Sequence, residues 1–240
     1  MGKLIRCQAL KSPLGIAILL VTVSWECPSF GQGATGQTAP AAPGPTLIDL
    51  PSDPSTRAAI NGMVSQGIMR PRNETRFDPD SPYALGDFLV SLQRMFRLGG
   101  SPASVEYPDV PRGSSYYDAV RATEPYLMRQ MVCFGCSLSL NLEPGQPTSR
   151  LQQIVSLVSI LVAQEKLRLL TNEETRSVLA GNAAGPLRGP ARNYYATAIQ
   201  NGITSLAPGD VVAPAFRCSR AEVAVLFDTV QKKFSVPAVR

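Results

Sequence analysis

Apolar residues recur at helical spacing in several segments of the chain, whereas the alternation typical of strands is scarce. The clearest helix is expected from about Ala84, with apolar positions every three or four residues: Leu85, Phe88, Leu89, Leu92, Met95 and Phe96. A second apolar helix is expected from Ser149, and a third begins at the segment Cys218-Ser219-Arg220-Ala221-Glu222. The pattern predicts a mainly α fold.

A less apolar helix precedes each of these three. The first is expected from Pro54 to Gln66, with Gly67 as a left-handed C-cap before Ile68. The other two are expected around Tyr116-Tyr117 and from Ala191. Between the second and third units, the capping box Thr171-Asn172-Glu173-Glu174 predicts a further short helix to about Ala180.

The chain therefore repeats a helix-loop-helix unit three times, at 54–100, 101–165 and 166–240, the last unit including the short helix. The second helices begin at the equivalent positions Leu85, Arg150 and Arg220. Because each unit is too small to close its own core, we expect one domain assembled from the three repeats.

The first 53 residues differ from the rest. Residues 1–31 are typical of a cleaved secretory signal, with a basic start, the uncharged run 14–23, and small residues Ser29 and Gly31 before Gln32. Lipid attachment at Cys27 stays open, although Trp25 and Glu26 precede it where small residues would be expected. Residues 32–53, rich in Gly, Ala, Pro and Thr, predict a flexible linker, with ordered structure from near Pro54. We expect an exported protein with no transmembrane segment after cleavage.

Charge and composition exclude several functions. Without residues 1–31 the formal net charge falls from +5 to +3, and the basic residues are dispersed, so nucleic-acid binding is not expected. A mild positive balance suits an anionic wall polymer or lipid surface. The chain has no histidine, which removes Ser–His–Asp and Cys–His catalysis and the commonest zinc ligand. We expect no enzyme, metal or cofactor, although carboxylate or lysine chemistry stays open.

Several short motifs recur in the same order in the repeats. They are Tyr107-Pro108-Asp109-Val110-Pro111, Gly67-Ile68 and Gly202-Ile203, Phe77-Asp78-Pro79 and Leu142-Glu143-Pro144, and Ser219-Arg220-Ala221-Glu222. Over residues 54–234 the chain resembles the S-layer homology family. The second repeat departs from it with Leu151-Gln152 after Ser149-Arg150, and the first keeps an acid but loses the arginine in Ala84-Leu85-Gly86-Asp87.

The resemblance implies a three-sided prism, in which the three helix-loop-helix repeats pack as a pseudo-threefold bundle. Wall polysaccharide is then expected to bind in grooves between repeats. The groove of Arg220 is then the first candidate and that of Arg150 the second, whereas the Leu85 position lacks the arginine. Glu222, Tyr117 and Tyr195 are further candidate ligand-binding residues.

Each candidate also has a structural interpretation. Ser219 and Glu222 form a capping box. Arg220 opposes the helix dipole, which favours either a ligand or pairing with an acid such as Asp210 or Glu222. Tyrosines at helical spacing are often core or rim residues.

Cys133-x-x-Cys136 and Cys218 are candidates for a structural disulfide, either within the Cys-x-x-Cys segment or from one of its cysteines to Cys218. A redox dithiol would need a βαβ setting, and a zinc site would need more ligands than Cys218 and carboxylates supply.

The sequence thus predicts a secreted, non-catalytic cell-envelope protein that binds peptidoglycan or an associated wall polysaccharide. Two alternatives remain: an assembly module that binds envelope proteins, and an extracytoplasmic thiol protein that uses Cys133 and Cys136.

Overall fold

The computed structural model describes residues 46–100, 106–127, 141–180, 187, 189–205 and 217–237. All of them belong to one compact unit, Pro43–Arg240. The described residues form seven α-helices and one 3-10 turn, and no strand. The predicted mainly α class is confirmed.

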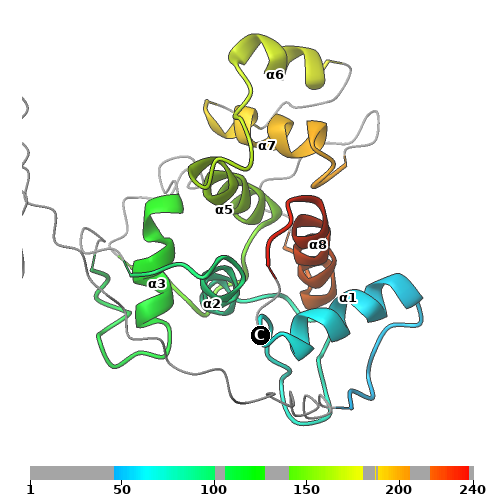
Figure 1. Cartoon of the computed structure of the whole chain (residues 1–240). Coiled ribbons are helices and arrows are strands. Elements are labelled where there is room, and N and C mark those ends of the chain that lie inside the picture. Colours follow the sequence, from blue (N-terminus) through cyan, green and yellow to red (C-terminus); the bar gives the residue numbers. More distant parts are fainter. Residues whose placement is uncertain are drawn as a thin grey trace, which may run out of the picture. The chain divides into compact units, whose positions relative to one another are not determined.

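The helices follow the predicted order (Figure 1). They are α1 (Pro54–Ser65), α2 (Leu85–Phe96), α3 (Tyr117–Thr123) followed by the 3-10 turn η1 (Glu124–Tyr126), α5 (Arg150–Ala163), α6 (Asn172–Val178), α7 (Ala191–Gln200) and α8 (Arg220–Lys233). The predicted start at Thr171 is confirmed, because Thr171 caps α6 and Glu174 closes the capping box.

Helices α1 and α7 end in the same way. Gly67 and Gly202 have φ angles of +66° and +59°, a left-handed conformation that glycine adopts without a steric penalty. The N–H of the next residue then donates back into the helix, from Ile68 to Met63 over 3.0 Å and from Ile203 to Ala198 over 2.9 Å. The predicted glycine C-cap at Gly67 is confirmed.

The helices pack in pairs. Helix α3 packs on α2, α7 on α5 and α1 on α8, so the first and last of the described helices are in contact. Helix α6 packs on the outer side of α7, and in Figure 1 α6, α7 and α5 follow one another as layers.

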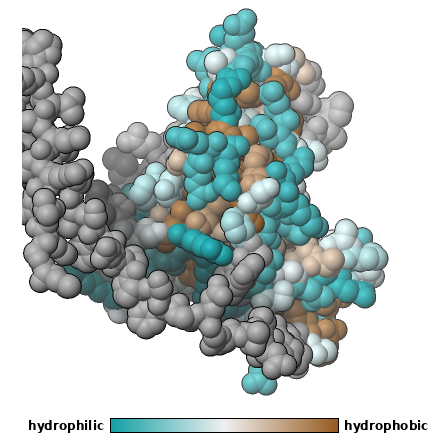
Figure 2. Space-filling view, viewed as in Figure 1, coloured by the Kyte–Doolittle hydropathy of each residue, from teal (hydrophilic) through white to brown (hydrophobic). Residues whose placement is uncertain are grey.

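One hydrophobic core joins these pairs. Ten of the fourteen residues of α5 are buried, which is expected of a helix that is covered on most sides. The rings of Phe88 in α2 and Phe227 in α8 stack with centroids 5.8 Å apart. In Figure 2, hydrophilic residues cover much of the visible face and hydrophobic residues show between them. Val225, by contrast, lies on the outer side of α8, 38% exposed.

Contacts to the core begin earlier than expected. Leu47 and Leu50, inside the segment predicted to be a flexible linker, pack against the core, and the Asp49 carboxylate binds backbone N–H groups 28 and 29 residues further along. Ordered structure therefore begins before Pro54. The Gly, Ala, Pro and Thr residues of the segment indicate a linker, but Leu47 and Leu50 near its end provide apolar side chains for the core.

Candidate functional site

The N-termini of α2, α5 and α8 meet at one end of the helices. Three isolated antiparallel bridges join them: Ala84 with Pro147, Ser149 with Arg217, and Ser219 with Pro82. In each bridge, the N-cap residue of one helix pairs with the residue two positions before the N-cap of another. The three bridges therefore form a closed cycle, and this end is where the structure brings the predicted motif residues together.

Side chains cap two of the three helices. At α8 the Ser219 hydroxyl accepts from the N–H of Glu222 over 3.2 Å, and the Glu222 carboxylate accepts from the N–H of Ser219 over 2.8 Å. At α5, Ser149 and Gln152 make the same box. Gln152 therefore keeps the capping function despite its departure from the family motif. At α2 the N-cap is Ala84, whose methyl side chain cannot accept a hydrogen bond.

Loop carbonyls satisfy amides in the first turns of α2 and α8. Arg220 and Ala221 donate N–H bonds of 2.9 Å to the carbonyls of Ser81 and Pro79, and Leu85 and Gly86 donate bonds of 2.8 Å to Gln146 and Pro144. These amides would otherwise lack partners, because a helix cannot satisfy its own first N–H groups. The loop before α2 thus binds the first turn of α8, and the loop before α5 binds the first turn of α2.

Two aspartates hold the loops that contain the apolar-x-Pro motifs. The Asp49 carboxylate accepts from the N–H groups of Phe77 and Asp78, both over 2.8 Å. The Asp109 carboxylate accepts in the same way from Leu142 and Glu143, over 2.9 and 2.7 Å. In both loops the middle residue is left-handed, with φ +61° at Asp78 and +57° at Glu143.

Sequence reasoning missed the role of Asp49, although the segment Ile48-Asp49-Leu50-Pro51 shares its Asp-x-Pro spacing with Asp109-Val110-Pro111. Burial opposes ionisation at Asp49, but the two backbone N–H donors outweigh it and lower the pKa of this carboxyl.

Arg220 is almost fully buried, 2% exposed. Its Nε donates to the Phe77 carbonyl over 2.7 Å and its Nη2 to the Arg70 carbonyl. The guanidinium also lies over the rings of Phe77 and Tyr83, at 4.6 and 5.4 Å from their centroids. Burial lowers its pKa. Arg220 thus fastens α8 to the loop before α2 through backbone carbonyls, a role that neither sequence interpretation included.

Arg150, at the same position in α5, has a different environment. Its Nη2 lies 3.2 Å from Oε1 of Glu222, and the two side chains are 27% and 39% exposed. Glu222 therefore pairs with Arg150, while also capping α8, and does not pair with Arg220. Asp210, the other acid considered for Arg220, lies outside the described residues.

The two candidate tyrosines lie in different places. Tyr195 is in the core, 3% exposed. Tyr117 is half-buried at the start of α3, and the Arg121 guanidinium lies over its ring at 5.8 Å from the centroid. Its neighbour Tyr116 covers Gly86, where an added Cβ would lie 2.8 Å from the Tyr116 ring. Ligand contact by Tyr117 or Tyr195 stays a prediction.

Cys218 is a free thiol in the core, 1% exposed. Burial raises its pKa to about 11, although the charge of Arg150 opposes the rise. Gln153, beside it on α5, is fully buried and interacts weakly with the thiol, which opposes the rise in the Cys218 pKa. Neither amide atom makes a hydrogen bond to a nitrogen or oxygen atom among the described residues. Cys133 and Cys136 lie outside the described residues.

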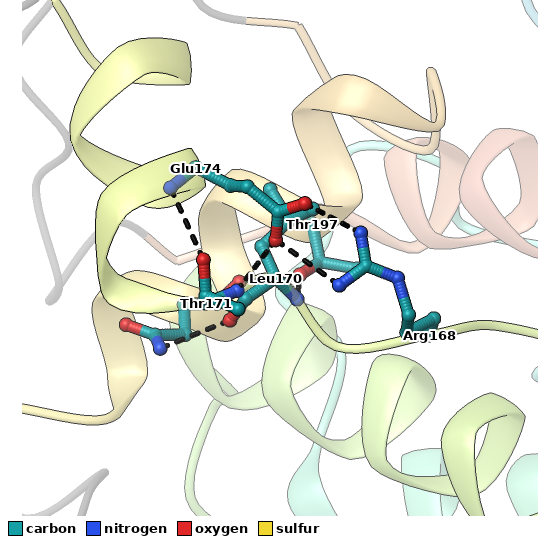
Figure 3. A network of polar contacts seen from close by, with 6 residues as sticks. Arg168, Leu170, Thr171, Glu174 and Thr197 are labelled. Carbon is teal, nitrogen blue, oxygen red and sulfur yellow. Dashed lines mark hydrogen bonds and ion pairs between the residues drawn. The ribbon is translucent and has the colours of Figure 1, made fainter.

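A separate polar network holds α6 against α7 (Figure 3). The Arg168 guanidinium makes two bonds to the Glu174 carboxylate, of 3.1 and 2.6 Å, and lowers its pKa to about 2. The N–H of Leu170 donates to the Thr197 hydroxyl over 3.1 Å, which fastens the turn to α7. The network is a structural contact, exposed at Arg168 and Glu174 and buried at Thr197.

Within the part of the chain that the structure describes, no group of His, Cys, Asp and Glu side chains could hold a metal ion. In the same residues, no helix has the length and apolar character needed to cross a membrane. No protein-family model matches the sequence, and a search of curated proteins finds no match.

Proposed function

We propose that this chain is an exported, non-catalytic cell-envelope protein whose three divergent repeats, similar to S-layer homology repeats, bind peptidoglycan or an associated wall polysaccharide. The observation that carries the proposal is the cyclic relation between the repeats. The resemblance in sequence motifs alone covers the third repeat well and the other two poorly.

The helix pairs support this cyclic relation. In each pair the first helix of one repeat packs on the second helix of the preceding repeat: α3 on α2, α7 on α5, and α1 on α8. The last pair joins the first repeat to the third. The closed cycle of bridges and the matched Asp49 and Asp109 contacts follow the same order. On this interpretation α6 is an insertion in the third repeat that packs on α7.

The junctions between repeats are the proposed binding region. Arg150 is the more accessible motif arginine, because a quarter of its side chain is exposed while Arg220 is covered. A guanidinium suits a carboxylate or phosphate on an acidic polymer through paired hydrogen bonds. The absence of histidine supports a binding function over a catalytic one.

Co-sedimentation of the purified protein with cell-wall sacculi tests the proposal. We expect retention above that of an unrelated protein of similar charge, with Arg150→Ala weakening it several-fold at low salt. Arg176→Ala, which removes an exposed arginine from α6, is the matched control and should bind like the wild type. Absence of wild-type retention at low salt would reject wall binding and favour the assembly-module alternative, which crosslinking to envelope proteins would then examine.

A further inference from the structure

The ion pair between Arg150 and Glu222 connects the first turns of α5 and α8. The bridge between Ser149 and Arg217 brings the starts of these two helices side by side. Arg150 is the first residue of α5 and Glu222 the third residue of α8, and Nη2 of the arginine lies 3.2 Å from Oε1 of the glutamate. Both side chains are partly exposed, at 27% and 39%. The pair therefore lies at the surface of a junction between the second and third repeats.

The two partners differ in how firmly they are held. Oε2 of Glu222 accepts from the N–H of Ser219 over 2.8 Å, and the capping box fixes this carboxylate at the start of α8. Arg150 makes one side-chain hydrogen bond among the described residues, from Nη2 to Glu222, and no other carboxylate there pairs with it. A guanidinium has five N–H donors, so most of those on Arg150 stay available. Arg150 can therefore leave the pair while the cap of α8 stays intact.

The cap itself does not require a charge at this position. In α5 the neutral side chain of Gln152 occupies the equivalent position, and its Oε1 accepts from the N–H of Ser149 over 2.8 Å. A glutamine at position 222 would close the same box. What the charge of Glu222 adds is the ion pair with Arg150.

An ionised carboxylate beside Arg150 opposes the binding of another anion to the same guanidinium. It occupies one of the N–H donors and repels a second negative group that approaches the junction. A partly exposed ion pair is weak, so a carboxylate or phosphate that forms two parallel hydrogen bonds with the guanidinium can displace it. A sugar hydroxyl forms weaker hydrogen bonds and is less able to do so. The pair therefore favours anionic groups over neutral ones.

We propose that Glu222 is an internal competitor for Arg150, which it occupies until a carboxylate or phosphate of an acidic polymer displaces it. This inference rests on the proposed wall-binding function and deepens it. Glu222, a motif residue, does not contact the polymer favourably; it sets how strongly and how selectively Arg150 binds.

Titration calorimetry of the purified protein at low salt tests the inference. Polygalacturonate supplies carboxylates and polyphosphate supplies phosphates, and the polymer that binds more tightly identifies the anion. Glu222→Gln keeps the cap and removes the competing charge, so it should raise affinity about three- to fivefold. Arg150→Ala should lower affinity, and in that background Glu222→Gln should change it less than about twofold, because no guanidinium is released.

Glu174→Gln is the matched control. Glu174 is also the third residue of its helix, closes a capping box with Thr171 and pairs with an arginine, Arg168 (Figure 3). The substitution removes the same charge and releases an arginine beside α6 instead of at the junction. It should change affinity less than about 1.5-fold, because exposed charges far from the ligand are screened.

Ser219→Ala separates the charge of Glu222 from the cap. It weakens the same capping box but keeps the acid, so it should not raise affinity even if it lowers the Tm. The inference is overturned if Glu222→Gln binds no better than the wild type, if Glu174→Gln or Ser219→Ala gives an equal gain, or if neither polymer binds any variant.

Co-sedimentation with sacculi, run in parallel, keeps this inference distinct from the proposed function. If the soluble polymers respond as expected but sacculi do not retain the protein, the wall function fails while the role of Glu222 stands. If sacculi retain the wild type but Glu222→Gln and Glu174→Gln bind the polymers equally, the role of Glu222 fails while the wall function stands.

Discussion

Helices α5 and α8 begin with the same two residues, a serine N-cap and an arginine, yet the two arginines lie in opposite surroundings. Arg220 is covered and bound to two loop carbonyls, whereas Arg150 is partly exposed and bound to a carboxylate. The comparison shows that the same motif position serves two roles. The residues that pack against the start of each helix determine which role its arginine takes. The first role stabilises the fold, and the second leaves the guanidinium accessible.

Replacing each arginine by alanine should separate the two roles most strongly. Arg220→Ala leaves the carbonyls of Phe77 and Arg70 without that donor and removes two ring contacts, so we expect a loss of about 3 kcal/mol in the free energy of unfolding. Arg150→Ala breaks a partly exposed ion pair and should cost less than about 1 kcal/mol. Urea unfolding at pH 7 measures both, and similar losses for the two variants would contradict the distinction.

Asp49 should matter next, because it holds the loop on which Arg220 is seated. Asp49→Ala removes the acceptor of two backbone N–H groups and should cost about 2 kcal/mol at pH 7, with Asp49→Asn between it and the wild type. The folded pKa of Asp49 is lowered, so its contribution is present above the unfolded value of about 3.9 and is lost as the pH falls through the folded value.

Urea unfolding at pH 7, 5 and 3 checks this dependence on pH. The stability difference between wild type and Asp49→Ala should persist to about pH 5 and shrink towards pH 3. A difference that grows at low pH would show that Asp49 does not act through its charge.

A smaller effect of opposite sign is expected inside α5. Gln153 occupies a core position whose equivalents in the other two helices are Phe88 and Val223, four residues after each N-cap. Gln153→Leu should therefore stabilise the protein by about 1 kcal/mol, because it removes a buried amide that makes no hydrogen bond to a nitrogen or oxygen atom among the described residues.

The matched control is the same change one residue earlier. Gln152→Leu breaks the capping box and should destabilise by about 1 kcal/mol. Thermal unfolding of both variants is the measurement, and a loss of stability in Gln153→Leu would show that the amide has a partner that matters.

The rate at which the Cys218 thiol is alkylated should report how well the N-terminal end of α8 is covered, because Cys218 precedes the N-cap Ser219. This measurement needs no substitution. With burial and a pKa of about 11, the thiol is rarely ionised at pH 8. Alkylation by iodoacetamide, followed by mass spectrometry of the peptide that contains Cys218, should be more than a hundredfold slower in the native protein than in urea. Rates within tenfold of each other would mean that this end of α8 opens readily.

Local patterns predicted the local structure well. The starts of α6 and α8 and the glycine C-cap of α1 follow from capping boxes and glycine placement, which depend on neighbours within a few residues. The surroundings of Arg220 could not be predicted, because its partners Phe77 and Arg70 are 143 and 150 residues away. Asp49 was missed because its Asp-x-Pro signal lies within a segment whose composition indicates a linker.

The α1–α8 contact also constrains how the chain folds. Gln66 and Gln231, 165 positions apart in the sequence, form hydrogen bonds across it. Joining such distant segments costs chain entropy before the contact contributes any stabilisation. During synthesis, α1 emerges long before α8 exists, so Ile60 and Met63 have no final partner surface until the last helix is made. We therefore expect the α1–α8 contact to form late in folding. A nascent chain stopped before residue 220 should remain an open intermediate that exposes apolar side chains of α1 and is prone to aggregate.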